Sequence, residues 1–339
     1  MRNNEIKKSK YVKTFIDCIK LKFGQRIPIK VGHLITYRCN LNCSFCYNKT
    51  QMGKNKEMNS EQIKSMMTEF AKMGTQIWKI GGGEPLLRPD LQEIIHHGKK
   101  LGFVMNLDTN GTLVKQNIEK LKELNNISIS LDGPKEIHDK IRGKGVFDKV
   151  EESIDLLHKI GIKTHLTSVI CNENIDYIEE LVSYAKKKNC YIRLQPVVPI
   201  NEEAKKDTAK DLIKKEVFKR ILKLKKIYNP IANSEFDIKR MEKYYSGEIN
   251  HYQKKCLAGK MYCVISPEGN VSPCLFKLTQ NWPNGTESSF SEAFKNLKVK
   301  YNCDCIFDAY YNMSRLYSLN PRMLLNAARN LKKGRWIYS

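Results

Sequence analysis

Between residues 30 and 195, apolar runs typical of β-strands alternate with segments of helical periodicity, and the pair recurs about every 30 residues. The expected strands are Lys30–Thr36, Gln76–Ile80, Val104–Asp108, Ile127–Leu131, Lys163–Ile170 and Tyr191–Gln195. The expected helices are Ser60–Met73, Asp90–Leu101, Val114–Leu124, Phe147–Ile160 and Ile175–Lys188. Such alternation predicts an α/β fold with a parallel sheet, either an open partial barrel or a doubly wound sheet. In both folds, functional residues collect at the carboxyl ends of the strands.

The chain changes character on both sides of this region. Residues 1–29 have the pattern of a basic amphipathic helix, and residues 201–255, rich in Lys and Glu, are expected to form a helical bridge. After Cys256 a short hairpin is expected, with a turn at Pro267-Glu268-Gly269-Asn270, followed by an irregular stretch and a helix around 321–332. We therefore expect a small C-terminal extension after the α/β region.

The chain carries 59 Lys and Arg against 36 Asp and Glu, a net charge of +23. Most of the cations are Lys and are scattered through every segment, whereas base readout and phosphate clamps rely more on Arg. A solvated basic surface is the simplest interpretation and argues against nucleic acid as a partner. An acidic partner or a membrane surface stays open as an alternative.

The cysteines indicate a reducing compartment. There are 11 of them, an odd number that cannot pair completely, and the N-terminus has no apolar signal core. The apolar runs are shorter than the roughly 20 residues that cross a bilayer. We therefore expect a cytoplasmic protein that uses cysteines for metal or redox chemistry.

Three cysteines lie within eight residues after the first expected strand, in the sequence Cys39-Asn40-Leu41-Asn42-Cys43-Ser44-Phe45-Cys46. A structural zinc site takes four ligands, commonly as paired C-x2-C units, whereas an iron–sulfur cube with three protein ligands leaves one iron open. The spacing favours the cube. Zinc, or cysteines buried as ordinary apolar residues, are the alternatives.

A glycine-rich segment, Gly81-Gly82-Gly83-Glu84-Pro85, follows the second expected strand. Glycines allow the backbone to approach a ligand closely, and Pro85 favours an extended Glu84 whose carboxylate could meet a cation. Taken alone, the segment is more simply an ordinary tight turn.

The cysteine spacing resembles the CxxxCxΦC signature of the radical S-adenosylmethionine (radical SAM) enzymes, with Phe45 in the aromatic place. The resemblance covers residues 33 to about 196 and implies a partial (β/α)6 TIM-like barrel over residues 30–200. It implies a [4Fe–4S] cluster on Cys39, Cys43 and Cys46, whose open iron is chelated by S-adenosylmethionine. An electron from a partner such as flavodoxin or ferredoxin then releases a 5′-deoxyadenosyl radical, which abstracts a hydrogen atom from the substrate.

The same resemblance implies further cofactor contacts. Glu84 of the GGE motif would hold the methionyl ammonium, Ser130 and Asp132 would reach the ribose or the substrate, and Arg142 would pair with the methionyl carboxylate. Ordinary caps or surface charges are the alternative for the last three. The cofactor-binding residues expected in all are Phe45, Gly82, Gly83, Glu84, Asn110, Ser130, Asp132 and Arg142.

The second cysteine group surrounds the expected hairpin. Four thiolates there can enclose one metal centre, and spacing alone does not exclude zinc. Residues 256–339 resemble the shortened SPASM domain called twitch, which implies an α+β extension carrying one auxiliary [4Fe–4S] cluster. Its expected ligands are Cys256, Cys274, Cys303 and Cys305. Cys263, in an alternating strand, is expected to be packed or to serve as a reserve ligand.

The substrate is less constrained. We expect a peptide, in a maturase-type modification; the alternative is a lipid, sugar or other small metabolite at a membrane surface. The basic amphipathic ends favour that alternative, with Val12, Phe15, Ile16 and Ile19 on one face of the first end. RNA modification and a non-catalytic electron carrier are lesser alternatives. A lone thiol, Cys171, Cys190 or Cys263, could donate a hydrogen atom but is more simply a small buried residue.

Overall fold

The computed structural model describes residues 16–17, 19–46, 48, 56–197, 215–228, 230–246, 248, 256–278 and 280–299. Cys303, Cys305, the expected helix at 321–332 and Val12 and Phe15 of the N-terminal segment lie outside these residues. Of the expected N-terminal helix, residues 16, 17 and 19–22 are described and are helical. No helix in these described ranges combines the length and apolar character needed to cross a bilayer.

One curved sheet organises the described residues, with strand order β6-β5-β4-β3-β2-β1-β7-β8. Its strands are β1 (Lys30–Thr36), β2 (Ile77–Gly82), β3 (Val104–Thr109), β4 (Asn126–Ser130), β5 (Lys163–Ile170), β6 (Tyr191–Pro196), β7 (Tyr262–Ile265) and β8 (Val271–Ser272). Strands β1 to β6 are parallel throughout. The α/β class and the partial-barrel architecture predicted from the sequence are therefore confirmed.

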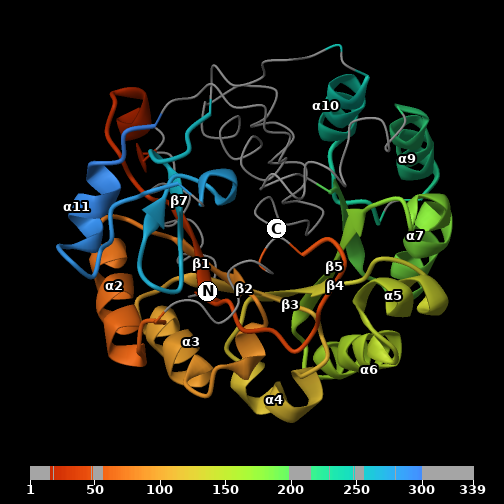
Figure 1. Ribbon diagram of the computed structural model, residues 1–339, viewed down its shortest axis with the longest axis horizontal. Helices are drawn as coiled ribbons and strands as arrows, with labels where there is room; N and C mark the ends of the chain where they lie inside the picture. Colours follow the sequence, from red (N-terminus) through yellow and green to blue (C-terminus); the bar gives the residue numbers. More distant parts are fainter. Residues whose placement is uncertain are drawn as a thin grey trace, which may run out of the picture.

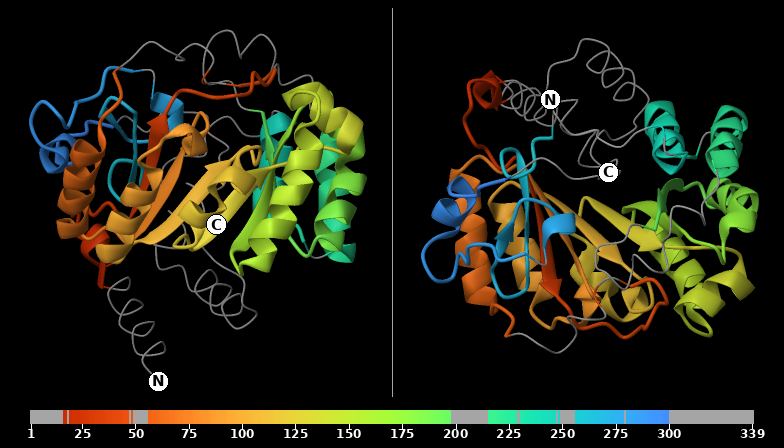
Figure 2. Two further views of the ribbon diagram at one scale, coloured as in Figure 1. Left: turned by 90° about the horizontal axis from the view of Figure 1, so that it is seen from below. Right: turned by 45° about the horizontal axis from the view of Figure 1, so that its top comes forward.

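The helices lie around the outer side of this sheet (Figures 1 and 2). They are α2 (Ser60–Lys72), α3 (Leu91–Lys100), α4 (Val114–Leu121), α5 (Lys135–Arg142), α6 (Val146–Lys159), α7 (Ile178–Lys187), α9 (Lys215–Ile227), α10 (Glu235–Tyr245) and α11 (Phe290–Lys295). Short 3-10 turns occur at Pro85–Leu87, Ile175–Tyr177 and Leu275–Lys277. Helix α5 was not expected from the sequence, because its KEIHDKIR stretch buries only His138 and Ile141.

Alternation along the strands separates the core from the lumen. In β5, Thr164, Leu166, Ser168 and Ile170 are buried toward the helices, while His165 and Thr167 face the inner side. An aromatic group anchors the helix-side core: Trp78 stacks on Phe103 at a centroid distance of 5.5 Å and meets Phe70 edge-on. The core thus lies outside the sheet, and polar side chains are left inside it.

Both edges of the six parallel strands are covered. Beside β6, Ile231 forms a bridge with Ile192, and the Asn233 side chain bonds both the N–H and the C=O of Leu194, at 2.8 and 2.9 Å. This segment joins α9 to α10, the described helices within the expected bridge. It shields backbone groups that an open edge would expose.

At the opposite edge, β7 pairs in parallel with β1, and β8 pairs in antiparallel with β7. The hairpin expected after Cys256 is therefore present, and it continues the barrel sheet, which was not expected. Arg26 donates hydrogen bonds to the carbonyls of Lys295 and Leu297, at 2.9 and 2.7 Å, where α11 ends. The segment before β1 is thus tied to the end of α11.

Candidate active site

The cysteine loop follows β1 directly, at the carboxyl edge of the sheet. Cys43 is buried, Cys39 and Cys46 are partly exposed, and all three are free thiols. The Cys46 N–H donates to the carbonyl of Cys43 at 3.2 Å, and the Leu41 N–H points at the Cys39 sulfur at 3.4 Å. The loop is therefore compact, and the Cys39 sulfur faces a backbone N–H donor within it.

Side chains that follow strand β3 contact this loop. Asn110, after β3, donates to the Asn40 side chain at 2.9 Å and lies 3.9 Å from the Cys39 sulfur. Asn40 in turn donates to Thr112 at 2.8 Å. The sequence offered no sign of the Asn40 contacts, because they join residues about 70 positions apart.

Arg142, at the end of α5, approaches the loop from the other side. Its Nη1 lies 3.9 Å from the Cys43 sulfur, and its guanidinium carbon lies 5.6 Å from the centre of the Phe45 ring. Its Nε forms an ion pair with Asp132 at 2.5 Å. The predicted contact of Arg142 with a methionyl carboxylate stays a prediction.

Asp132 is fully buried and has three neighbours that fix it. One carboxylate oxygen pairs with Arg142, the other accepts the Val169 N–H at 2.8 Å, and its own N–H donates to His138 Nδ1 at 3.0 Å. Burial lowers the pKa of His138 to about 4, so the ring is neutral and can accept this bond. In this arrangement Asp132 positions Arg142; its predicted contact with ribose or substrate stays a prediction.

Glu84 is fully buried beside the cysteine loop. Its carboxylate accepts hydrogen bonds from the N–H of Asn110 and the hydroxyl of Thr109, both at 2.8 Å, and from the N–H of Leu86 at 3.1 Å. Burial raises the pKa of Glu84 to about 7 despite these bonds. A cation placed beside this carboxylate would favour its ionised form, because opposite charge lowers the pKa of an acid.

The glycines before Glu84 serve a close approach to the chain's own backbone. Gly83 and Glu84 donate N–H bonds to the carbonyls of Thr36 and Arg38, both at 2.8 Å. A Cβ on Gly83 would lie 2.1 Å from the Arg38 carbonyl oxygen, and one on Gly82 would lie 2.3 Å from that of Thr36. The GGE segment is thus locked against the start of the cysteine loop.

The chemistry of the loop fits an iron–sulfur cube. Burial raises the pKa of the Cys39 and Cys43 thiols, so they become good ligands only when a metal removes their protons. No three described His, Cys, Asp or Glu side chains converge on a point that would hold a single metal ion. A cube takes one sulfur per iron, so the three thiols need not converge, and Arg142 and Asn110 supply donors to the sulfurs.

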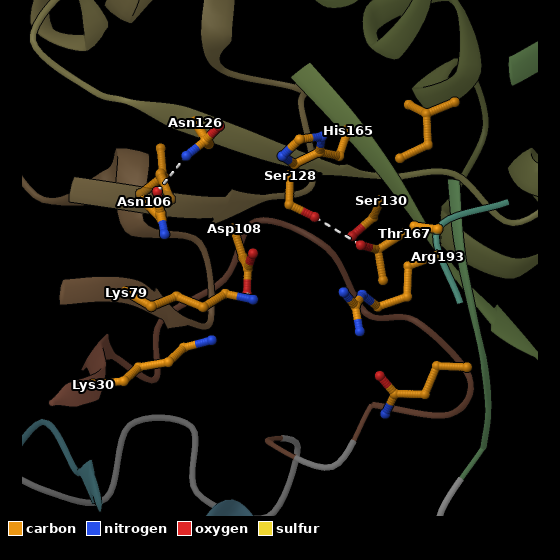
Figure 3. A pocket seen from close by; sticks show the side chains of 14 residues that line it. Lys30, Lys79, Asn106, Asp108, Asn126, Ser128, Ser130, His165, Thr167 and Arg193 are labelled. Atoms are coloured by element: carbon orange, nitrogen blue, oxygen red, sulfur yellow. Dashed lines mark hydrogen bonds and ion pairs between the residues drawn. The ribbon is translucent and has the colours of Figure 1, made fainter. Parts of the chain in front are cut away.

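Beneath this edge, the strands enclose a cavity of about 180 Å³ (Figure 3). Ser130, the last residue of β4, lines it and is the one residue that does so among the predicted site residues within the described ranges. The polar lining was overlooked in the sequence, although alternating polar residues in β3 to β6 signalled it.

The second cysteine group is described in part. Cys256 and Cys274 belong to one small apolar cluster with Tyr262, and the Cys256 sulfur lies 3.1 Å from the Tyr262 hydroxyl. Cys263 is buried in the main core on the other face of β7. That placement supports a packing role for Cys263. The pairing of Cys256 and Cys274 with Cys303 and Cys305 stays a prediction.

The two remaining described thiols lie at different levels of the sheet. Cys171 follows β5 at the same carboxyl edge as the cysteine loop, whereas Cys190 precedes β6 and lies 3.6 Å from His158. Burial raises the pKa of both to about 12. Both are therefore protonated thiols at neutral pH.

Comparison with known proteins identifies the class. The family model of the Radical SAM superfamily matches residues 34–185, the region that contains the cysteine loop, Glu84 and Arg142. Residues 34–185 are therefore a radical SAM domain, and the chain is an enzyme. The cofactors of the superfamily are a [4Fe–4S] cluster and S-adenosylmethionine.

The relatives of this chain are named for different activities. The AdoMet-dependent heme synthase of Methanosarcina barkeri is 28% identical over 80% of this chain and 83% of the relative. The mycofactocin maturase MftC of Mycolicibacterium smegmatis is 26% identical over 75% of this chain and 66% of the relative. Streptococcus suis SuiB bound to S-adenosylmethionine has a TM-score of 0.64 at 16% identity, covering 84% of this chain and 67% of SuiB. SuiB bound to its precursor peptide SuiA gives 0.63 at 15%, covering 83% and 66%. These structural likenesses concern the fold.

Proposed function

We propose that this chain abstracts a hydrogen atom from a peptide in a maturase-type modification, assisted by one auxiliary iron–sulfur cluster. The observation that carries the proposal is the joining of the cysteine loop to the buried Glu84 carboxylate at one edge of the sheet, directly above a polar lumen. A reactive group generated at that edge would face a substrate in the lumen.

The residues at this edge divide the work. Cys39, Cys43 and Cys46 would hold a [4Fe–4S] cluster, which with bound S-adenosylmethionine supplies a 5′-deoxyadenosyl radical. Glu84 would bind the methionyl ammonium, and its burial keeps water from competing for the carboxylate. Thr109 and the Asn110 N–H hold that carboxylate in one orientation. Flavodoxin or ferredoxin would supply the electron.

A peptide substrate is supported by two relatives. One is named a maturase, and SuiB has been solved with a precursor peptide. The net charge of +23 suits an acidic segment of such a peptide. Cys256 and Cys274, which share one cluster, would supply half of the auxiliary centre, and Cys303 and Cys305 the other half.

A small metabolite is the second candidate. The heme synthase relative, matched over 83% of its length, favours it. The same edge and lumen would serve either substrate class, so only turnover separates the two.

The test is formation of 5′-deoxyadenosine by the anaerobically reconstituted, dithionite-reduced chain. Wild type should form it, and Glu84→Gln should weaken binding of S-adenosylmethionine about tenfold or more, because a charge-assisted bond is replaced by a neutral one. The Cys39/Cys43/Cys46 triple Ala variant should form none. Cys190→Ala, a buried thiol at the far edge, is the matched control and should behave as wild type.

Substrate classes are separated by adding candidate peptides or tetrapyrroles to the same reaction. A peptide whose addition raises deoxyadenosine formation and whose mass changes supports the proposal. Stimulation by small metabolites alone would replace it with the second candidate. Deoxyadenosine formation that persists in the triple variant would contradict the assignment of the cysteine loop.

A further inference from the structure

Most of the described residues that line the lumen are polar, beside Leu107, Leu166 and Ala232. The interior of a closed (β/α)8 barrel is filled by layers of bulky branched residues. Here side chains from β1 to β6 leave a cavity of about 180 Å³. The charged and polar residues of its lining that matter below are Lys30, Lys79, Asp108, Asn126, His165 and Arg193 (Figure 3). A concave cavity with convergent polar groups is the usual form of a ligand site.

The lining is positively charged. Lys30, Lys79 and Arg193 are cations, and Asp108 is the one carboxylate among the described residues that line the cavity. Lys79 pairs with Asp108 at 2.8 Å. Burial, together with Arg193 and Lys79, lowers the pKa of His165 to about 4, so this ring is neutral at pH 7. The described residues that line the cavity therefore include three cations and one carboxylate.

Three polar atoms of this lining are buried without a partner. Asp108 Oδ1, Asn126 Oδ1 and His165 Nε2 have no hydrogen-bond partner among the described residues. A buried polar atom that is left unpaired destabilises the folded chain. Two of the three are oxygens that need N–H or O–H donors, so a suitable ligand carries donors as well as negative charge.

The cavity lies directly below the cofactor edge. A Cβ on Gly81, which opens the glycine segment, would lie 3.8 Å from Asp108 Oδ2. Lys79 and Asp108 precede Gly81 and Asn110 by two residues, roughly 7 Å along each strand. A group bound by Lys79 would thus lie about two residues along the strand from the loop that contains Glu84.

We propose that Lys79, Arg193 and Lys30 bind a carboxylate of the substrate in this lumen, while Asp108 and Asn126 accept hydrogen bonds from donors beside that carboxylate. Because it deepens the proposed function, the inference rests on it: the peptide segment that enters the lumen is acidic. The same chemistry, a carboxylate with neighbouring donors, could belong to an acidic peptide or to a small hydroxy acid.

The experiment is calorimetric binding to the reconstituted full chain with S-adenosylmethionine present. The probes are an acetylated pentapeptide with two adjacent glutamates, its glutamine counterpart, and citrate as the small carboxylate. The glutamate peptide should bind about tenfold or more tightly than the glutamine peptide, and high salt should reduce the difference.

Variants separate charge recognition from structural damage. Lys79→Met and Arg193→Gln should each weaken glutamate-peptide binding about tenfold, whereas Asp108→Asn should tighten it by removing the competing carboxylate. Lys115→Met is the matched control, because Lys115 also pairs with a carboxylate, Glu152 at 2.6 Å, but on the outer surface. Damage to the fold would weaken binding in Lys79→Met and Asp108→Asn alike.

The outcomes are distinct. Opposite effects of Lys79→Met and Asp108→Asn on the glutamate peptide support the inference. The same opposite effects on citrate, with no peptide binding, keep the carboxylate site and remove the peptide. Equal binding of the glutamate and glutamine peptides, or weakening by both variants, overturns the inference, and the deoxyadenosine assay still tests the proposed function independently.

Discussion

The ion pair of Arg142 with Asp132 is the most buried one among the described residues, with side-chain exposures of 9% and 0%. It lies between the cysteine loop and the end of β4, so its geometry sets where the guanidinium meets Cys43 and Phe45. A buried pair adds little net stability, but removing one partner leaves an uncompensated charge. The pair therefore fixes the position of the Arg142 guanidinium, and removal of either partner destabilises the folded chain.

Arg142→Met is expected to lower the free energy of unfolding of the cluster-free chain by about 3–5 kcal/mol, because Asp132 is left buried and unpaired. The double variant with Asp132→Asn should be more stable than Arg142→Met alone. Urea unfolding measures both. A double variant that is less stable than Arg142→Met would contradict this account of the pair.

His33 gives the chain a built-in sensitivity to acid. It is buried in β1 beside Trp78, neither ring nitrogen has a hydrogen-bond partner among the described residues, and burial together with Arg88 lowers its pKa to about 3. Between about 6.5 and 3 the unfolded chain binds a proton that the folded chain does not, so stability falls as pH falls through this window.

Lowering the pH from 7 to 5 should therefore cost about 2 kcal/mol through His33 alone. His33→Leu, which cannot take up the proton, should lose that much less stability over the same change. The measurement is urea unfolding of the cluster-free chain at both pH values. Equal losses in the two proteins would show that His33 is not responsible.

At the scale of elements, the glycine segment and the cysteine loop behave as one unit. Gly83→Ala would push a Cβ against the Arg38 carbonyl, whereas a Cβ on Gly81 meets nothing closer than 3.8 Å. Gly83→Ala should cost about 1–3 kcal/mol, as overpacking does, and should weaken binding of S-adenosylmethionine by displacing Glu84.

Gly81→Ala, two positions away in the same segment, is the control and should change stability by less than about 0.5 kcal/mol. Urea unfolding and calorimetric titration with S-adenosylmethionine report the two effects. Equal tolerance of both substitutions would mean that the segment is not held against the cysteine loop as described.

Elements with a strong local pattern were predictable from the sequence, and elements held by distant contacts were not. β1 and β5 have the expected bounds, and the other four parallel strands end within two residues of theirs. Helix α5 was not predicted because few of its residues are apolar. The pairing of β7 with β1 joins residues more than 200 positions apart, so no local sequence pattern predicts it.

The site shows the same division. The cysteine spacing and the GGE segment could be predicted from the sequence because each motif is contiguous. The strand order then brings the two motifs together in the fold. The Asp132–Arg142–Cys43 chain of contacts and the cationic lumen depend on which way side chains turn once the sheet closes. In the sequence, only the alternation of polar residues along the strands indicated a polar lumen.

On the scale of the whole molecule, the described residues combine one radical SAM sheet, shielded at both edges, with a hairpin that carries Cys256 and Cys274 near one edge (Figure 2). The segment between helices α9 and α10, both drawn in teal, covers the other edge. The cysteine loop and the described pair Cys256 and Cys274 are therefore next to strands of one continuous sheet. Loss of one centre should leave the fold, and the other centre, in place.

The most direct test is the iron content per chain after anaerobic reconstitution, for wild type and for the Cys39/Cys43/Cys46 triple Ala variant. The account predicts about eight irons in wild type and a loss of about four in the variant, because one cube leaves and the auxiliary centre stays. About four irons falling to none would keep the first cluster and remove the auxiliary one. Iron content unchanged by the triple substitution would contradict the central claim that these three cysteines hold a cluster.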